Sequence, residues 1–184
     1  DTRTIKPGNI FFALKGDHFN GNTYALNALE AGAEFAVVDE DIEPGNPKLI
    51  PVADVLNCLQ DLAGYHRSQF DIPFIGITGS NGKTIVKEWL YQLLNNNYHI
   101  VRSPKSYNSQ VGVPLSVLNM EAANELAIFE AGISTIGEME NLQKIIQPTI
   151  GILTNIGSAH DAGFSSREEK LEEKLKLFTG CDAV

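Results

Sequence analysis

The sequence is poor in cysteine and in basic residues. Its 184 residues include 2 cysteines, Cys58 and Cys181. Two are too few for a disulfide framework or a cysteine-rich metal site, so we expect reduced thiols. The 14 basic residues are outnumbered by 23 acidic ones, for a formal net charge of −9. A dedicated nucleic-acid-binding protein needs a basic face, and this balance argues against one.

Long apolar segments are also missing. Runs such as residues 72–77 fall far short of the roughly 20 residues that cross a bilayer as a helix. No basic segment followed by an apolar one opens the sequence. We therefore expect a cytoplasmic protein that does not insert into membranes. With 43% hydrophobic residues and 9 phenylalanines, the chain has enough apolar side chains to fold, which argues against disorder.

The acidic excess is uneven along the chain. Residues 1–72 contain 11 acidic and 5 basic residues, whereas residues 73–184 contain 12 and 9. Pro73 also disfavours helix at Ile72. These features predict two domains, residues 1–72 and residues 73–184.

Both parts show alternating strand and helix patterns. In the first part we expect strands at 9–14, 35–38 and 48–52, and helices at 23–31 and 53–69, the first of them capped by Thr23 and ended by Gly32. In the second part we expect strands at 74–78, 99–102, 126–130 and 149–154, and helices at 83–95, 137–146 and 166–178. Continuous apolar strands are typical of a parallel sheet covered by helices on both faces, so the predicted fold class is α/β.

A glycine-containing turn, T-G-S-N-G-K-T, joins an apolar strand to a helix at residues 78–84. In this context glycines let the backbone approach an anion, and the N-terminus of the helix attracts it. Lys83 can reach the β- and γ-phosphates, and the Thr84 hydroxyl suits Mg²⁺. The alternative is an ordinary turn with a surface lysine. The candidate phosphate-binding residues are Thr78, Gly79, Ser80, Asn81, Gly82, Lys83 and Thr84.

This turn is shorter than the common pattern G-x-x-x-x-G-K-[ST], because Ile77 stands where that pattern has glycine. The shorter form resembles the ATP-binding loop of the Mur ligases and of the related folylpolyglutamate synthetases. The resemblance implies an α/β fold with a small UDP-sugar-binding domain, residues 1–72, before a truncated P-loop-type, parallel-sheet ATPase domain, of which residues 73–184 are the N-terminal part.

Two further segments carry the resemblance. Residues 106–115, S-Y-N-S-Q-V-G-V-P-L, could be a plain loop, but they are similar to a family segment that places Asn108 beside substrate and phosphate. Ser109 departs from that segment, and the loop is reminiscent of members fused to an alanine racemase domain. Glu130 ends an apolar strand, where open parallel sheets bind ligands. It is either a solvated acid or, as the family pattern implies, a ligand of the metal held by Thr84.

The last family marks lie near the C-terminus. Residues 154–160, T-N-I-G-S-A-H, resemble a second metal-binding segment of the family, which implies that His160 is a metal ligand. Mn²⁺ accepts an imidazole ligand better than Mg²⁺ does. The charge pattern alone makes the following helix a solvated face with i,i+4 pairs. The resemblance instead implies that Lys174 is carbamylated by CO₂ and binds a metal, with Lys170 as the fallback. Lys176 replaces the family's usual glutamate.

The N-terminus resembles the UDP-sugar-binding domain of the family, and implies nucleotide–sugar contacts by Thr2 and Arg3. Asn20 and Asn22 replace the usual Asp and His.

The implied activity is ATP-dependent ligation of D-Ala-D-Ala to UDP-MurNAc-tripeptide through an acyl phosphate, in peptidoglycan biosynthesis. Metal ions would be held by Thr84, Glu130, His160 and Lys174, and the catalytic set is Lys83, Asn108, His160 and Lys174. We expect the chain to be the first part of such a ligase, inactive without a further C-terminal domain. The alternatives are a Mur ligase that adds the third peptide residue, a folylpolyglutamate synthetase, or a nucleotide-binding module without turnover.

Overall fold

A computed structural model describes residues 2–157 and 163–184. The chain forms two compact units, Asp1–Leu59 and Gln60–Val184. The division falls inside helix α2 (Val55–Arg67), whereas the sequence analysis placed a boundary at Ile72 and Pro73.

The first unit is built on a parallel three-stranded sheet. Its strand order is β1 (Ile10–Phe12), β4 (Phe35–Val38), β5 (Leu49–Pro51). A short hairpin of β2 (Lys15–Gly16) and β3 (Phe19–Asn20) follows β1, and α1 (Ala25–Glu30) packs on β4. The core consists mainly of alanines and valines with Phe11. The predicted α/β character of this part is confirmed.

One predicted cap in this unit is wrong. Thr23 lies within the 3₁₀ helix η2 (Gly21–Tyr24), and its hydroxyl donates a hydrogen bond to the carbonyl oxygen of Asn20 at 2.8 Å. The side chain of Asn20 caps η2 instead. Asn22 is buried and donates to Asp39 Oδ1 at 2.7 Å, so it fastens η2 to the chain after β4. Gly32 has a φ of +108°, as expected for a glycine that ends a helix.

The second unit contains a parallel four-stranded sheet with the order β7 (Ile100–Arg102), β8 (Leu126–Glu130), β6 (Phe74–Thr78), β9 (Ile150–Leu153). β6 is central and buried at every position. Its partners are in register, with Ile77 opposite both Glu130 and Ile152. The predicted parallel sheet is confirmed.

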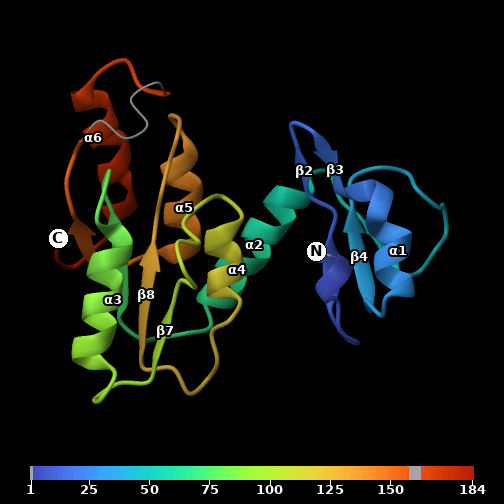
Figure 1. Ribbon diagram of the computed structural model, residues 1–184, viewed down its shortest axis with the longest axis horizontal. Helices are drawn as coiled ribbons and strands as arrows, with labels where there is room; N and C mark the ends of the chain where they lie inside the picture. The colour runs from blue at the N-terminus through green and yellow to red at the C-terminus, as the bar shows by residue number, and fades with distance from the viewer. Residues whose placement is uncertain (1, 158–162) are drawn as a thin grey trace. The chain divides into compact units, whose positions relative to one another are not determined.

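Helices cover both faces of this sheet. Successive side chains of a strand point to opposite faces, so neighbouring residues of one strand pack against different helices. Ile75, Ile77 and Ile128 pack against the apolar side of α3 (Lys83–Leu94). Phe74 and Phe129 lie in the cluster of the other face. That cluster includes side chains of α4 (Gly112–Val117) and α5 (Glu138–Ile146), drawn beside the sheet in Figure 1.

Two elements of this unit differ from expectation. Residues 106–115 are not a plain loop, because α4 begins within them, at Gly112. The C-terminal helix is α6 (Arg167–Leu175), continued by the 3₁₀ helix η4 (Lys176–Phe178). The charge pattern predicted a solvated charged face for this helix, but Lys170 and Lys174 are buried and Leu175 is exposed.

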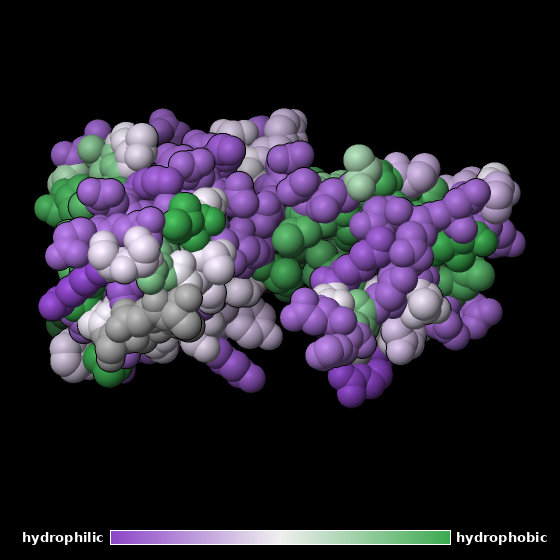
Figure 2. All heavy atoms as spheres, turned by 90° about the horizontal axis from the view of Figure 1, so that it is seen from above, coloured by the Kyte–Doolittle hydropathy of each residue, from purple (hydrophilic) through white to green (hydrophobic). Residues whose placement is uncertain are grey.

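Hydrophilic side chains cover most of the face shown in Figure 2, and apolar ones are exposed in separate groups. None of the helices in the described part of the chain is long and apolar enough to cross a membrane.

Candidate phosphate and metal site

The loop between β6 and α3 turns at two glycines with positive φ. Gly79 has a φ of +141°, and Gly82, at the N-cap of α3, has a φ of +83°. A Cβ at Gly79 would lie 2.0 Å from Thr154 Oγ1, so no larger residue fits there. The two glycines therefore allow positive φ values, and Gly79 also allows Thr154, the residue after β9, to approach the loop closely.

Residues after β9 brace this loop. The Ser80 backbone N–H donates to the Asn155 carbonyl at 2.9 Å, and the Asn81 N–H donates to Asn155 Oδ1 at 3.2 Å. The Ser80 hydroxyl accepts a hydrogen bond from the Gly157 N–H at 2.9 Å. Thr78 is buried and donates to the carbonyl of Ala131 at 2.8 Å. Thr78 and Ser80 thus fix the loop through their side chains.

Lys83 opens α3 and folds back over the loop. Its Nζ donates to the Gly79 carbonyl at 2.7 Å. Partial burial lowers the pKa of Lys83, and the nearby carboxylate of Glu130 opposes that shift. The ammonium group therefore lies at the turn that leads into α3, and the N-terminus of a helix attracts anions.

Thr84 and Glu130 meet where β8 ends. The Thr84 hydroxyl donates to Glu130 Oε2 at 2.9 Å, and Glu130 is completely buried. Two adjacent hard oxygens fit Mg²⁺, which keeps water and takes phosphate oxygens alongside few protein ligands. Among the described residues, no group of three or more His, Cys, Asp and Glu side chains could hold a metal alone. The hydroxyl of Thr84 and the carboxylate of Glu130 therefore fit Mg²⁺ by their chemistry.

Asn108 lies beside the same strand end. Its carbonyl accepts a hydrogen bond from the Gly132 N–H at 2.8 Å. A Cβ on Gly132 would lie 2.9 Å from Asn108 Oδ1, so the absence of a side chain at Gly132 makes room for the Asn108 amide. The loop before α4 and the end of β8 are thereby held together.

The lysines of α6 do not form a solvated face. Lys170 and Lys174 are buried, and Lys170 Nζ donates to the Gly157 carbonyl at 2.6 Å. Burial lowers the pKa of Lys174 to about 8, and the charges of Lys83 and Lys170 add to that shift. Gly157 also donates to the Ser80 hydroxyl, so Lys170 places a positive charge beside the segment that braces the glycine turn.

His160 lies outside the described residues. The segment that precedes it, 154–157, is the one that braces the phosphate loop.

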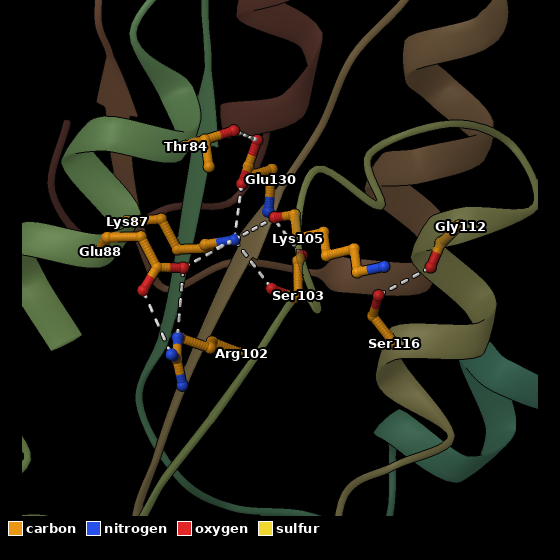
Figure 3. A network of polar contacts seen from close by, with 9 residues as sticks. All are labelled: Thr84, Lys87, Glu88, Arg102, Ser103, Lys105, Gly112, Ser116 and Glu130. Carbon is orange, nitrogen blue, oxygen red and sulfur yellow. Dashed lines mark hydrogen bonds and ion pairs between the residues drawn. The ribbon is translucent and has the colours of Figure 1, made fainter.

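A buried lysine on α3, Lys87, was not predicted from the sequence. Lys87 follows Lys83 by one helical turn, and its ammonium group contacts Glu130 Oε1 at 2.9 Å (Figure 3). The only signal in the sequence is its position next to the core-facing Val86, on the inward side of the helix.

A separate pocket of about 510 Å³ lies in the first unit. Thr2 and Arg3 line it, as the resemblance implied for a nucleotide–sugar site. Aromatic side chains complete the wall, and the rings of Phe19 and Tyr24 stack with centroids 6.1 Å apart. Partly exposed aromatic rings are suited to contact a planar base.

Comparison with known proteins identifies the family to which both units are similar. Residues 77–183 match the Mur ligase middle domain, and residues 1–67 match the Mur ligase family, catalytic domain. A UDP-N-acetylmuramoyl-tripeptide–D-alanyl-D-alanine ligase of Bacillus subtilis is 35% identical over 182 residues, which is 98% of this chain and 40% of that protein. The chain thus spans about two fifths of the length of the curated relatives it matches.

Solved structures give the same result. A crystal structure of MurF from Acinetobacter baumannii superimposes with a TM-score of 0.92 at 30% identity, covering 98% of this chain and 40% of that one. MurF ligase from Thermotoga maritima in complex with ADP superimposes with a TM-score of 0.91 at 31% identity, covering 99% and 42%. The middle-domain match alone covers more than half of the sequence, so the chain belongs to the Mur ligase family.

Proposed function

We propose that this chain provides the nucleotide-sugar-binding and ATP-binding parts of a ligase that joins D-Ala-D-Ala to UDP-MurNAc-tripeptide in peptidoglycan biosynthesis. The ATP assignment rests on one observation: the Thr84 hydroxyl, which follows the glycine turn in α3, donates a hydrogen bond to Glu130. The choice of substrates is supported by the 35% identity to the Bacillus subtilis enzyme of that name. The proposed location is the cytoplasm, where ATP is available.

The proposed reaction forms an amide in two steps. A carboxylate oxygen of the tripeptide attacks the γ-phosphorus of ATP, the bond to the β-phosphate oxygen breaks, and ADP leaves. The amine of D-Ala-D-Ala then attacks the carbonyl carbon of the acyl phosphate and loses a proton, and inorganic phosphate leaves. Phosphoryl transfer depends mainly on positioning and on charge stabilisation, which a preorganised cationic loop can supply.

Residues of the second unit have distinct roles in this proposal. Lys83 and the N-terminus of α3 bind the phosphates, and Asn108 contacts the transferred group or the substrate carboxylate. Thr84 and Glu130 would hold Mg²⁺, which offsets phosphate charge when bound. The family resemblance adds His160 and carbamylated Lys174 as ligands of a second ion, Mg²⁺ or Mn²⁺.

The first unit would bind the UDP-sugar. Thr2 and Arg3 offer donors for the diphosphate and sugar oxygens, and the stacked Phe19 and Tyr24 rings offer an apolar surface for the uracil.

Amide formation by the full-length protein tests the substrate assignment. With UDP-MurNAc-tripeptide and ATP, we expect product with D-Ala-D-Ala and little product with single amino acids, measured by mass spectrometry. A preference for one amino acid would favour the ligase that adds the third residue, and use of a folate would favour a folylpolyglutamate synthetase. Nucleotide binding with no product from any acceptor would support a binding module.

Replacing Lys83 tests the phosphate loop. We expect Lys83→Ala to lower substrate-dependent ATP hydrolysis by about 100-fold or more, because a preorganised charge beside the transferred phosphate is lost. Phosphate release is the measurement. The matched control is Lys144→Ala, which removes an exposed lysine of the same unit and should leave the rate unchanged. Normal turnover in Lys83→Ala would contradict the assignment.

Labelling with ¹³CO₂ tests the carbamate. Only the neutral amine attacks CO₂, so at fixed CO₂ the ¹³C-carbamate signal should rise with pH through about 8, the pKa of Lys174. We expect Lys174→Gln to abolish this NMR signal and Lys170→Gln to retain it. The opposite pattern would move the modification to Lys170, and a signal unchanged in both variants would refute carbamylation in α6.

A further inference from the structure

The buried ammonium group of Lys87 lies behind the candidate metal site. Lys87 is completely buried, and four oxygen atoms surround its Nζ (Figure 3). It donates to the carbonyl of Ser103 at 2.8 Å and to the carbonyl of Lys105, and it contacts Glu88 Oε1 at 3.2 Å and Glu130 Oε1 at 2.9 Å. The two carbonyl contacts are hydrogen bonds and the two carboxylate contacts are ion pairs. Glu130 Oε1 is buried and accepts no hydrogen bond from the described residues, so the charge of Lys87 is what compensates it.

These contacts hold Glu130 asymmetrically. Its Oε1 faces Lys87, whereas its Oε2 accepts a hydrogen bond from Thr84. Its own backbone N–H donates to the Ser103 hydroxyl at 3.1 Å. The two carboxylate oxygens therefore have different environments, and the side chain cannot rotate without breaking the contact to Lys87.

A buried ion pair is a costly way to stabilise a fold. Both side chains are completely buried, and well-packed apolar residues at such positions are often equally stable. Glu88, which also contacts Lys87, is itself held in place. Arg102 donates to both of its oxygens, at 3.4 and 3.1 Å, and stacks on Tyr91. This arrangement specifies the position of one carboxylate beside Thr84, which points to a role at the metal site.

We propose that Lys87 is a positioning residue that makes Glu130 a one-oxygen ligand and thereby favours Mg²⁺ over Ca²⁺. The proposal rests on the metal site of the proposed function. With Oε1 engaged by Lys87, only Oε2 is presented next to the Thr84 hydroxyl. Mg²⁺ requires near-octahedral geometry with short bonds to single oxygens, whereas Ca²⁺ has longer bonds, more ligands and often a carboxylate bound through both oxygens.

Metal competition on the full-length protein tests this role. Protein-bound Mn²⁺ is measured by electron paramagnetic resonance with a non-hydrolysable ATP analogue, and is displaced by Mg²⁺ or by Ca²⁺. We expect Lys87→Met to reduce the preference for Mg²⁺ over Ca²⁺ by about tenfold or more, the usual size of an effect from a group that orients a ligand. Losing a positive charge strengthens the binding of both divalent ions alike, so the ratio isolates the geometry.

A matched lysine provides the control. Lys15 contacts two carboxylates, Asp39 at 2.9 Å and Glu40 at 3.0 Å, in the other compact unit. Lys15→Met should keep the wild-type ratio of Mg²⁺ to Ca²⁺ binding. An unchanged ratio in folded Lys87→Met, checked by circular dichroism, would overturn the role of Lys87 while leaving the metal site intact. If the wild type shows no saturable Mn²⁺ binding, the metal site and the proposal are both overturned. The same holds if Thr84→Ala leaves Mn²⁺ binding unchanged.

A measurement on the wild type keeps the proposal testable if Lys87→Met fails to fold. In crystals of the wild type with Mn²⁺ and the ATP analogue, we expect the ion to contact Glu130 through Oε2 alone while Oε1 stays on Lys87. Coordination through both oxygens, or separation of Oε1 from Lys87, would refute it.

Discussion

The parallel pairing of β6 with a strand on each side is the constraint on which the candidate site depends. β6 is buried along its length, and its last residues lie opposite the last residues of β8 and β9. Three carboxyl ends therefore meet at one edge of the sheet. That edge places Glu130 within reach of Thr84 and lets the segment after β9 brace the glycine turn. A shift in register by one residue would turn Glu130 to the opposite face.

Local charge, and not net charge, suits this edge to an anionic substrate. The chain carries a net charge of −9, yet several of its 14 basic side chains gather around the end of β6. Lys87 and Lys170 are buried, and Lys83 is partly buried. Charges interact strongly at short range and in a low-dielectric setting, while exposed acids at a distance are screened. An acidic protein can therefore offer a cationic site without a basic surface.

Secondary-structure elements that depend on residues close together in the chain could be predicted from the sequence. The strand, glycine turn and helix of residues 74–94 were all expected, and so was the meeting of Thr84 with Glu130, because parallel strands end at one edge. Helix α4 was missed because Gly112 and Pro114 are weak helix formers in isolation. Tertiary packing stabilises it, since most of its residues are buried.

Features set by distant partners could not be predicted in this way. Lys170 and Lys174 of α6 are buried, although lysine side chains usually face water. Lys87 donates hydrogen bonds to carbonyls that lie 16 and 18 residues away in the sequence. No periodicity in the sequence encodes such contacts. His160 and the carbamylation of Lys174 rest on family resemblance, and they remain predictions.

Transfer of ¹⁸O tests the proposed chemistry most directly. UDP-MurNAc-tripeptide labelled with ¹⁸O in the reacting carboxylate is incubated with ATP, D-Ala-D-Ala and the full-length protein, and the inorganic phosphate is examined by mass spectrometry. An acyl phosphate predicts one ¹⁸O atom in each phosphate released, because the carboxylate oxygen leaves with the phosphoryl group. Amide product with unlabelled phosphate would contradict activation of the carboxylate by ATP.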